Sequence, residues 1–145
     1  CEVWQDIPKK LSKEIRNEAV AKEKEILLDI YASDVNKHVF NLARENSERA
    51  GVHDSILFEK KDISEFKTKK DKGVIITNPP YGERLKNSEI ENLYKKMSET
   101  FLKLPEWHYY ILTAYPELEK SMEKKAAKNR KLYNGKIKTY LYQYY

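Results

Sequence analysis

The hydrophobic positions of this chain fall into two kinds of pattern, which alternate along the sequence. Short continuous apolar runs, such as "GVIIT" at residues 73–77, predict buried strands, whereas apolar residues spaced three and four apart predict helices. The helix patterns cover residues 8–24, 35–52, 87–104 and 116–128, and the strand patterns cover residues 26–33, 56–62, 73–77 and 107–115. Residues 129–145 predict two further strands joined around Asn134-Gly135, a strong hairpin signal.

The order of these elements predicts the fold class. Strands alternate with helices, and the strands are continuously apolar rather than alternating between apolar and polar residues. This combination favours an α/β domain with a mostly parallel sheet, helices on both of its faces and a C-terminal antiparallel hairpin. In such sheets ligands bind beyond the carboxyl ends of the strands.

Three polar residues stand at predicted strand ends and are therefore candidates for one shared site. Asp34 ends the first strand, Asp62 the second and Asn78 the third. The carboxylate of Asp34 suits the diol of a ribose, since it can accept two hydrogen bonds. Each carboxylate also has a structural interpretation: Asp34 as the N-cap of the next helix, and Asp62 as an ordinary loop residue.

The sequence Asn78-Pro79-Pro80-Tyr81 has two interpretations. Two prolines can simply end a strand and start a turn, with Tyr81 as a partly buried core aromatic. Alternatively, the Asn78 side-chain oxygen and the Pro79 carbonyl accept hydrogen bonds from the two N–H groups of a conjugated amino group. These bonds draw the nitrogen lone pair out of conjugation, so that the nitrogen can act as a nucleophile. Tyr81 then offers a stacking face for a base removed from its helix. This chemistry needs positioning and electrostatics rather than a strong base.

Composition limits the function classes. At 145 residues the chain has the size of one domain, and it has no apolar stretch long enough for a membrane span and no secretory pattern. The single Cys1 excludes an internal disulfide and suits a reducing cytoplasm, and the three histidines give no zinc-ligand spacing. The net charge of +5 favours a polyanionic partner, although lysine-rich solvated helix faces account for it equally well.

The motif at residues 78–81 resembles motif IV of the class I amino-methyltransferases that use S-adenosylmethionine (SAM). The longer "NPPYGERL" is similar to the THUMP-associated RNA methyltransferase family, often described as N6-adenine-specific DNA methylases, and "ASDVN", "ARENSERAGV" and "KTYLYQYY" support the resemblance. The resemblance implies a Rossmann-like fold, SAM as cofactor and ribosomal RNA as partner, with guanine N2 in large-subunit rRNA as the target.

Roles for individual residues follow from the same resemblance. It implies that Asp34 binds the cofactor ribose and that Asp62 contacts the adenine amino group, with the Ile63 backbone nearby. It further implies that the target base is held by the motif residues Asn78, Pro79, Pro80 and Tyr81. Asn78 is assigned to the cofactor site as well as to the target site, and no metal is implied.

The chain departs from the family pattern in its glycines. The family has a glycine-rich cofactor loop after its first, central strand, whereas no two of the four glycines here are close enough for a G-x-G loop. We therefore expect residues 1–145 to be the C-terminal part of a methyltransferase domain, without the central strand, the glycine loop and the RNA-binding THUMP module. The strands at 26–33 and 73–77 should then either pair directly or recruit residues 1–7 or a second copy, so that the chain self-associates.

Two other classes of function stay open at this level. DNA adenine-N6 and protein glutamine-N5 methyltransferases use the same motif, because their targets are also planar, conjugated nitrogens. A nucleic-acid-binding or scaffold domain could keep the fold without a cofactor.

Overall fold

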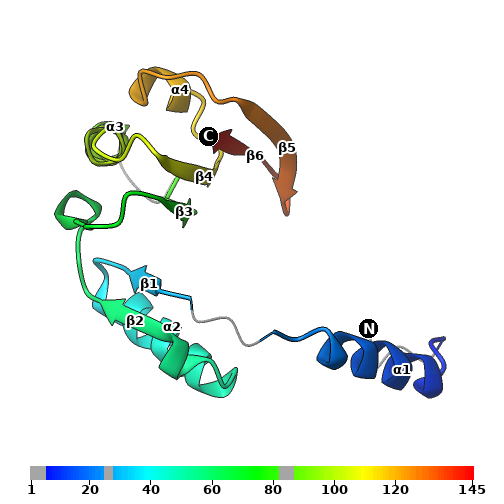
Figure 1. The fold of residues 1–145 in the computed structure, drawn as a ribbon. Coiled ribbons are helices and arrows are strands. Elements are labelled where there is room, and N and C mark those ends of the chain that lie inside the picture. Colours follow the sequence, from blue (N-terminus) through cyan, green and yellow to red (C-terminus); the bar gives the residue numbers. More distant parts are fainter. Residues whose placement is uncertain (1–5, 25–27, 82–86) are drawn as a thin grey trace.

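The computed structural model describes residues 6–24, 28–81 and 87–145 and confirms the α/β class (Figure 1). Its elements in chain order are α1 (Lys9–Ala21), β1 (Ile30–Ser33), α2 (Lys37–Arg49), η1 (His53–Ser55), β2 (Ile56–Glu59), η2 (Ile63–Glu65), β3 (Gly73–Thr77), α3 (Asn87–Phe101), β4 (Trp107–Thr113), α4 (Leu118–Ser121), β5 (Lys128–Asn134) and β6 (Ile137–Tyr144). The predicted strands and the first three predicted helices are all present, most of them shorter than the sequence patterns.

The strands form two separate sheets. β1 pairs with β2 in parallel, and the second sheet has the order β3-β4-β6-β5, in which only β3 and β4 are parallel. Of the two alternatives for the strands at 26–33 and 73–77, direct pairing does not occur: among the described residues β1 is bonded only to β2, and β3 only to β4. Within residues 6–24, 28–81 and 87–145, one edge of β1 and one edge of β3 have no partner strand, and Figure 1 shows the two sheets apart along the same arc of strands.

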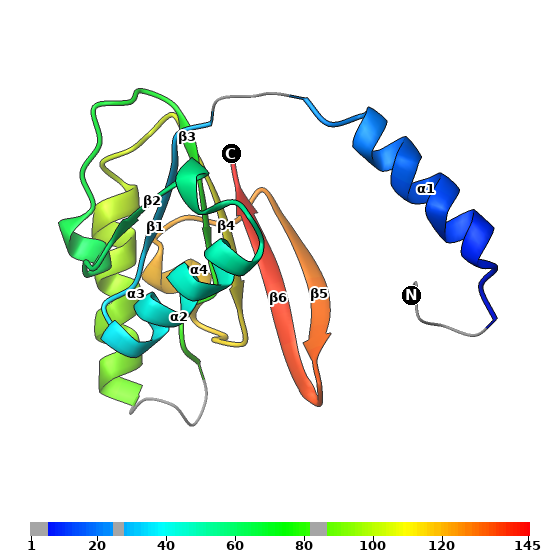
Figure 2. The same ribbon diagram turned by 90° about the horizontal axis from the view of Figure 1, so that it is seen from below.

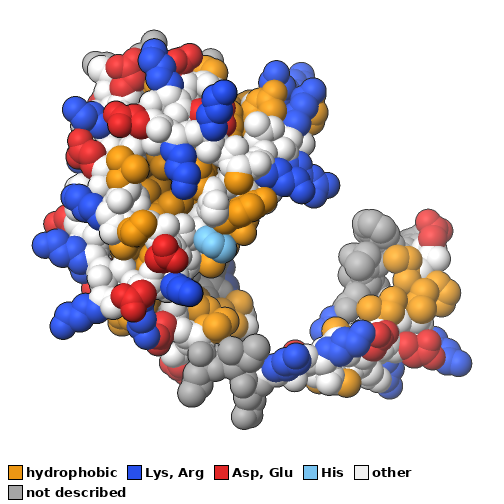
Figure 3. All heavy atoms as spheres, turned by 45° about the horizontal axis from the view of Figure 1, so that its top comes forward, with side chains coloured by type: hydrophobic (Ala, Val, Ile, Leu, Met, Phe, Trp, Pro, Cys, Tyr) orange, Lys and Arg blue, Asp and Glu red, His pale blue; other side chains and the backbone are white. Residues whose placement is uncertain are grey.

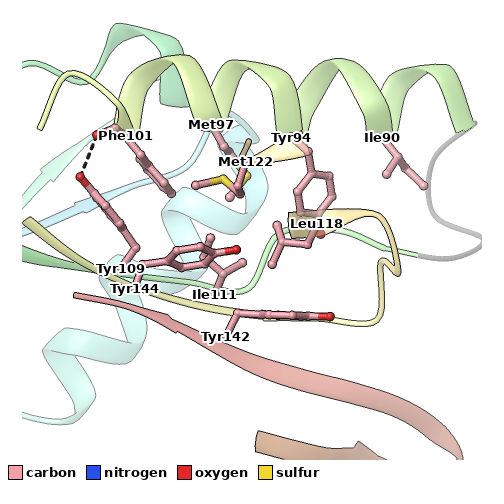
Figure 4. Packing of buried hydrophobic residues seen from close by; sticks show 10 residues of the cluster. All are labelled: Ile90, Tyr94, Met97, Phe101, Tyr109, Ile111, Leu118, Met122, Tyr142 and Tyr144. Carbon is pink, nitrogen blue, oxygen red and sulfur yellow. Dashed lines mark hydrogen bonds between the residues drawn. The ribbon is translucent and has the colours of Figure 1, made fainter. Parts of the chain in front are cut away.

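A compact core lies between α3, α4 and the strands β4 and β6. The apolar stripe predicted for α3 is buried here, with Tyr94 and Phe101 almost fully enclosed, and Ile111 and Leu118 are equally buried opposite it (Figure 4). The Tyr109 hydroxyl donates a hydrogen bond to the Phe101 carbonyl at 2.7 Å, which fixes the end of α3 on β4. Each of these large side chains contributes about 1.5–3 kcal/mol through burial.

The described residues of the first half of the chain have no comparable core. The helix pattern at 35–52 puts Val35, Val39 and Leu42 on one side, but all three are exposed, and in α2 only Ser47 is buried. The helix instead contacts β2 through Phe40, whose ring lies edge-on to Phe58 at 6.2 Å. The apolar face predicted for α1 is also exposed, and in Figure 2 this helix stands away from the rest of the chain.

The C-terminal hairpin is confirmed, and it changes the element before it. β5 and β6 pair from Lys128–Gln143 to Asn134–Ile137, and Gly135 takes a positive φ of 60° in the turn. The helix predicted for residues 116–128 is wrong in length, because α4 ends at Ser121 and Glu123 adopts a φ of 50°, outside the helical region. The Ala127 N–H then bonds to the Gln143 carbonyl at 2.9 Å, which starts the hairpin ladder.

The unpaired strand edges lead to a testable prediction. Ile76 on β3 is 80% exposed, and Val74 on the same face is exposed beside it. Unpaired edges with apolar side chains recruit other chains, so the isolated 145-residue chain should self-associate. Sedimentation velocity should show a coefficient that rises with concentration, and Ile76→Lys should reduce that rise. Lys103→Glu, an exposed charge change after α3, should not; a chain that stays monomeric at every concentration would contradict the prediction.

Candidate functional site

The predicted site residues lie at the carboxyl ends of three strands. Asp34 directly follows β1, and Asp62 lies three residues after β2 in the same parallel sheet, where Ser33 is opposite Glu59. Asn78 directly follows β3 in the other sheet. Figure 2 shows β1 and β3 running in the same general direction, so these ends open toward the same edge of the molecule.

The carboxylate of Asp34 is partly exposed and only partly used by the protein. Its Oδ1 accepts the Asn36 N–H at 2.7 Å, a local turn. Asn36, not Asp34, caps α2, because the Asn36 side chain accepts the N–H groups of His38 and Val39. The interpretation of Asp34 as the helix cap is therefore wrong, and its second oxygen has no partner among the described residues.

Asp62 has a structural role in the loop that follows β2. It caps η2 in a capping box, where its Oδ1 accepts the Ser64 N–H at 2.9 Å and the Ser64 hydroxyl at 2.6 Å. Its Oδ2 accepts from Lys96 Nζ of α3 at 3.3 Å. The Ser64 hydroxyl and N–H, with a smaller contribution from Lys96, hold the pKa of Asp62 below its usual value.

Ile63 joins this loop to α3. Its carbonyl accepts the Thr100 hydroxyl at 3.3 Å, and its side chain packs against the main core. Two residues of α3 therefore position this loop: Lys96 binds Asp62, and Thr100 binds the carbonyl of Ile63. The sequence did not indicate Lys96 and Thr100 as partners of this loop, because nothing in a helix pattern says which loop its polar side chains reach.

The depressed pKa of Asp62 predicts a pH dependence of stability. Because ionised Asp62 is favoured in the folded state, its stabilisation is present above about pH 4 and is lost as the pH falls through its folded pKa. The free energy of unfolding from urea titrations should therefore fall less steeply with acid in Asp62→Asn than in the parent chain. Asp71→Asn, which removes an exposed carboxylate nearby, is the control and should keep the parent's slope. Equal slopes for Asp62→Asn and the parent would contradict the prediction.

The motif after β3 combines a buried anchor with exposed polar groups. Pro79 is buried, while the neighbouring Asn78 is exposed, and its side-chain amide makes no hydrogen bond with any described residue. Tyr81 is half-buried, and its hydroxyl accepts a hydrogen bond from Asn134 Nδ2 at 3.3 Å. Residues 82–86, which include the whole of "GERL", lie outside the described residues.

Asn134 contacts the candidate site, which sequence reasoning did not predict. Its pairing with Gly135 indicated only a hairpin turn, yet the structure places this turn against Tyr81, 53 positions earlier in the chain. The structure does not bring all the predicted residues together: within the described ranges no hydrogen bond or ion pair joins Asp34, Asp62 and Asn78. The cofactor and target candidates therefore remain two separate groups of side chains.

Two findings concern other kinds of site. In the described part of the chain no group of three or more His, Cys, Asp or Glu side chains could hold a metal ion. No helix within residues 6–24, 28–81 and 87–145 has the length and apolar character needed to cross a bilayer.

Known proteins resemble this chain over nearly its whole length. A family model described as "RMKL-like, methyltransferase domain" matches residues 1–143. The Bacillus subtilis protein "Putative RNA methyltransferase YpsC" is 41% identical over 99% of this chain and 38% of its own length. A "Ribosomal RNA large subunit methyltransferase K/L" of Shewanella frigidimarina is 34% identical over 94% of this chain and 20% of its own length.

The fold is also similar to that of solved structures. The structure described as "SMU.472, a putative methyltransferase complexed with SAH" superposes with a TM-score of 0.87 at 40% identity. The superposition covers 99% of this chain and 39% of that protein. The chain thus spans about two fifths or less of the proteins that it resembles.

Proposed function

This chain belongs to the family of RMKL-like methyltransferase domains, and from that membership we propose that it is the C-terminal part of a SAM-dependent N-methyltransferase domain. The target is the exocyclic amino group of a nucleobase. The observation that carries the proposal is the exposed amide of Asn78 directly after β3, which has no hydrogen bond to any described residue and is followed by the buried Pro79.

The residues of the two strand ends fit the cofactor. The second oxygen of Asp34, which has no partner among the described residues, is available to a ribose hydroxyl. A carboxylate has about four lone-pair sites, and the hydrogen bonds from Ser64 and Lys96 leave one at Asp62 Oδ2 for an adenine amino group. The cofactor would supply an electrophilic methyl group, and the SAH bound to a relative is the product that remains after such a transfer.

At the target base, the motif residues would act by positioning the nitrogen of the exocyclic amino group. The side-chain oxygen of Asn78 and the carbonyl of Pro79 would accept hydrogen bonds from the two N–H groups of the amino group. The nitrogen lone pair would then leave conjugation with the ring and be free to attack the methyl group of the cofactor. Tyr81 holds the base by stacking, with its ring fixed by the bond to Asn134. As the nitrogen gains a methyl group it becomes more acidic and loses a proton to solvent, so no strong base is required from Pro80 or its neighbours.

For the substrate we propose guanine N2 in large-subunit ribosomal RNA, and with it a cytoplasmic location. The support is the name of the K/L relative and the similarity of "NPPYGERL" to the RNA-methylating group. The glycine loop and the upstream RNA-binding module belong, in this proposal, to the remaining length of the full protein. Adenine N6 of DNA and glutamine N5 of a protein remain the competing targets, because the motif chemistry suits all three.

A transfer assay with the full-length protein tests this proposal. The protein is incubated with methyl-labelled SAM and, in separate reactions, unmodified ribosomal RNA, duplex DNA or a peptide release factor. Label in guanine N2 of the RNA is the expected result. Label only in DNA or protein would replace the substrate, and a protein that does not bind SAM in a calorimetric titration would support the non-enzymatic class.

A further inference from the structure

The positive charge of this chain is concentrated at its C-terminus. Residues 124–145 contain seven of the 28 Lys and Arg residues and none of the 23 Asp and Glu residues, so the remaining 123 residues carry 21 basic and 23 acidic side chains. The whole net charge of +5 therefore comes from the hairpin and the residues leading into it. In Figure 3 the hairpin, at the upper right, carries Lys and Arg side chains without Asp or Glu among them, whereas both kinds of charge are mixed over the rest of the visible face.

The face of the hairpin on the α3 side alternates basic and aromatic residues. Register places Lys131 opposite Tyr140 and Tyr133 opposite Lys138, so these four side chains lie on one face. Lys131 Nζ lies 5.3 Å from the centre of the Tyr133 ring, and Lys138 Nζ lies 5.5 Å from that of Tyr140. Tyr133 is nevertheless 64% exposed, so its ring remains open to a further stacking partner.

These cations are free to bind an anion. Within the described residues, none of the seven basic side chains of residues 124–138 forms an ion pair with a carboxylate. Lysines on an edge strand such as β5 can also serve only to prevent association between sheets. That role does not account for the exposed tyrosine between them, since an apolar ring at an edge favours association.

The hairpin also lies next to the proposed target site. Asn134, the last residue of β5, donates its side-chain hydrogen bond to the hydroxyl of Tyr81. The tip of the hairpin extends beyond β4, because Thr113 pairs with Tyr140 and the residues before Tyr140 in β6 pair only with β5. Nucleotides beside a base held at Tyr81 would therefore meet the basic and aromatic face first.

We propose that this face, formed by Lys131, Tyr133 and Lys138 together with Lys136 of the adjoining turn, binds the single-stranded RNA that flanks the target base. The lysines contact phosphates and Tyr133 stacks on one neighbouring base, a combination that suits unpaired nucleotides. The proposal rests on the proposed function for the identity of the base at Tyr81. The binding surface itself follows from the charge and geometry of the hairpin.

The salt dependence of RNA binding tests the phosphate contacts. Binding of the full-length protein to a single-stranded ribosomal RNA oligonucleotide is measured without cofactor between about 50 and 200 mM salt. The triple variant Lys131→Gln, Lys136→Gln, Lys138→Gln should lose about two units of the slope of log K against log salt. The matched control Lys67→Gln, Lys95→Gln, Lys103→Gln removes the same charge from exposed positions outside the hairpin and should keep the parent slope.

Substitution of Tyr133 tests the stacking contact separately. Tyr133→Leu should weaken RNA binding by about 5- to 150-fold while leaving the salt slope unchanged. Tyr133→Phe keeps the ring and should bind as the parent does. Circular dichroism and sedimentation of each variant establish that the hairpin is folded and that the protein has not aggregated.

The outcomes separate this inference from the proposed function. Equal slopes for the two triple variants, or tighter binding of duplex DNA than of RNA by the parent, would overturn the hairpin surface even if methylation is normal. Aggregation of the hairpin triple variant with unchanged binding would assign the lysines to edge protection and would also overturn it. If the slope changes as expected but no RNA is methylated, the RNA surface stands and the proposed function fails.

Discussion

Asn78→Ala in the full-length protein is expected to lower the turnover of methyl transfer by about 10²–10³-fold, the effect of removing one positioned polar group from a reaction centre. Asn78 directly follows β3 and is exposed, with its amide unbonded among the described residues, so its loss should leave the fold intact. Single-turnover kinetics with saturating SAM and RNA measure the effect without a contribution from binding.

Two controls make this result specific to the target amino group. Cofactor affinity should change little, because in this proposal Asn78 acts mainly on the acceptor nitrogen. Asn92→Ala, an exposed asparagine on α3, should turn over as the parent does. A normal rate for Asn78→Ala would remove the proposed activation of the amino group.

Asp34→Ala is expected to weaken SAM binding, by roughly 1.5–3 kcal/mol for each charge-assisted hydrogen bond that is lost. One oxygen of Asp34 accepts from the Asn36 N–H, and the other, which has no partner among the described residues, is the one proposed to bind the ribose. Calorimetric titration of the full-length variant, at a temperature where it is folded, measures the change in affinity.

The Asp34 result must be separated from damage to the turn before α2. Asp34→Asn keeps an oxygen for the Asn36 N–H but has no charge, so it should be stable and still bind SAM weakly. Asp54→Ala, at an exposed position in η1, should leave affinity unchanged. Lower stability with normal affinity in Asp34→Ala would assign this residue to the turn alone.

The sequence predicted burial correctly where the structure supplies a packing partner, and wrongly where it does not. The apolar face of α3 is buried, because its residues pack against β4 and β6, which follow it in the C-terminal half of the chain. The same kind of pattern on α2 predicted a buried face, yet Val39 and Leu42 are exposed. Periodicity indicates which face of a helix is apolar, but not whether a partner covers it.

The site shows the same distinction between local and distant contacts. The sequence placed Asp34, Asp62 and Asn78 at strand ends, and the structure agrees for Asp34 and Asn78. Asp62 lies three residues beyond the end of β2, where it caps η2. The sequence interpretation named only Asp34 as a possible cap of α2, whereas Asn36 caps it. Both residue types are common helix caps, so residue type alone does not locate the cap. The contact between Asn134 and Tyr81 depends on the register of the hairpin with β4, which no local pattern contains.

The separation of the two sheets predicts that this chain does not unfold as one cooperative unit. The C-terminal unit of α3, α4, β4 and β6 has its own enclosed core, whereas β1, β2 and α2 bury few apolar side chains. Local opening of the first unit therefore takes much less free energy than opening of the second. The two units are joined at η2, through the bonds from Lys96 to Asp62 and from Thr100 to Ile63, and also by the ion pair between Lys70 and Asp29. The proposed adenine contact is thus attached to the stable unit, and the proposed ribose contact to the unit that opens first.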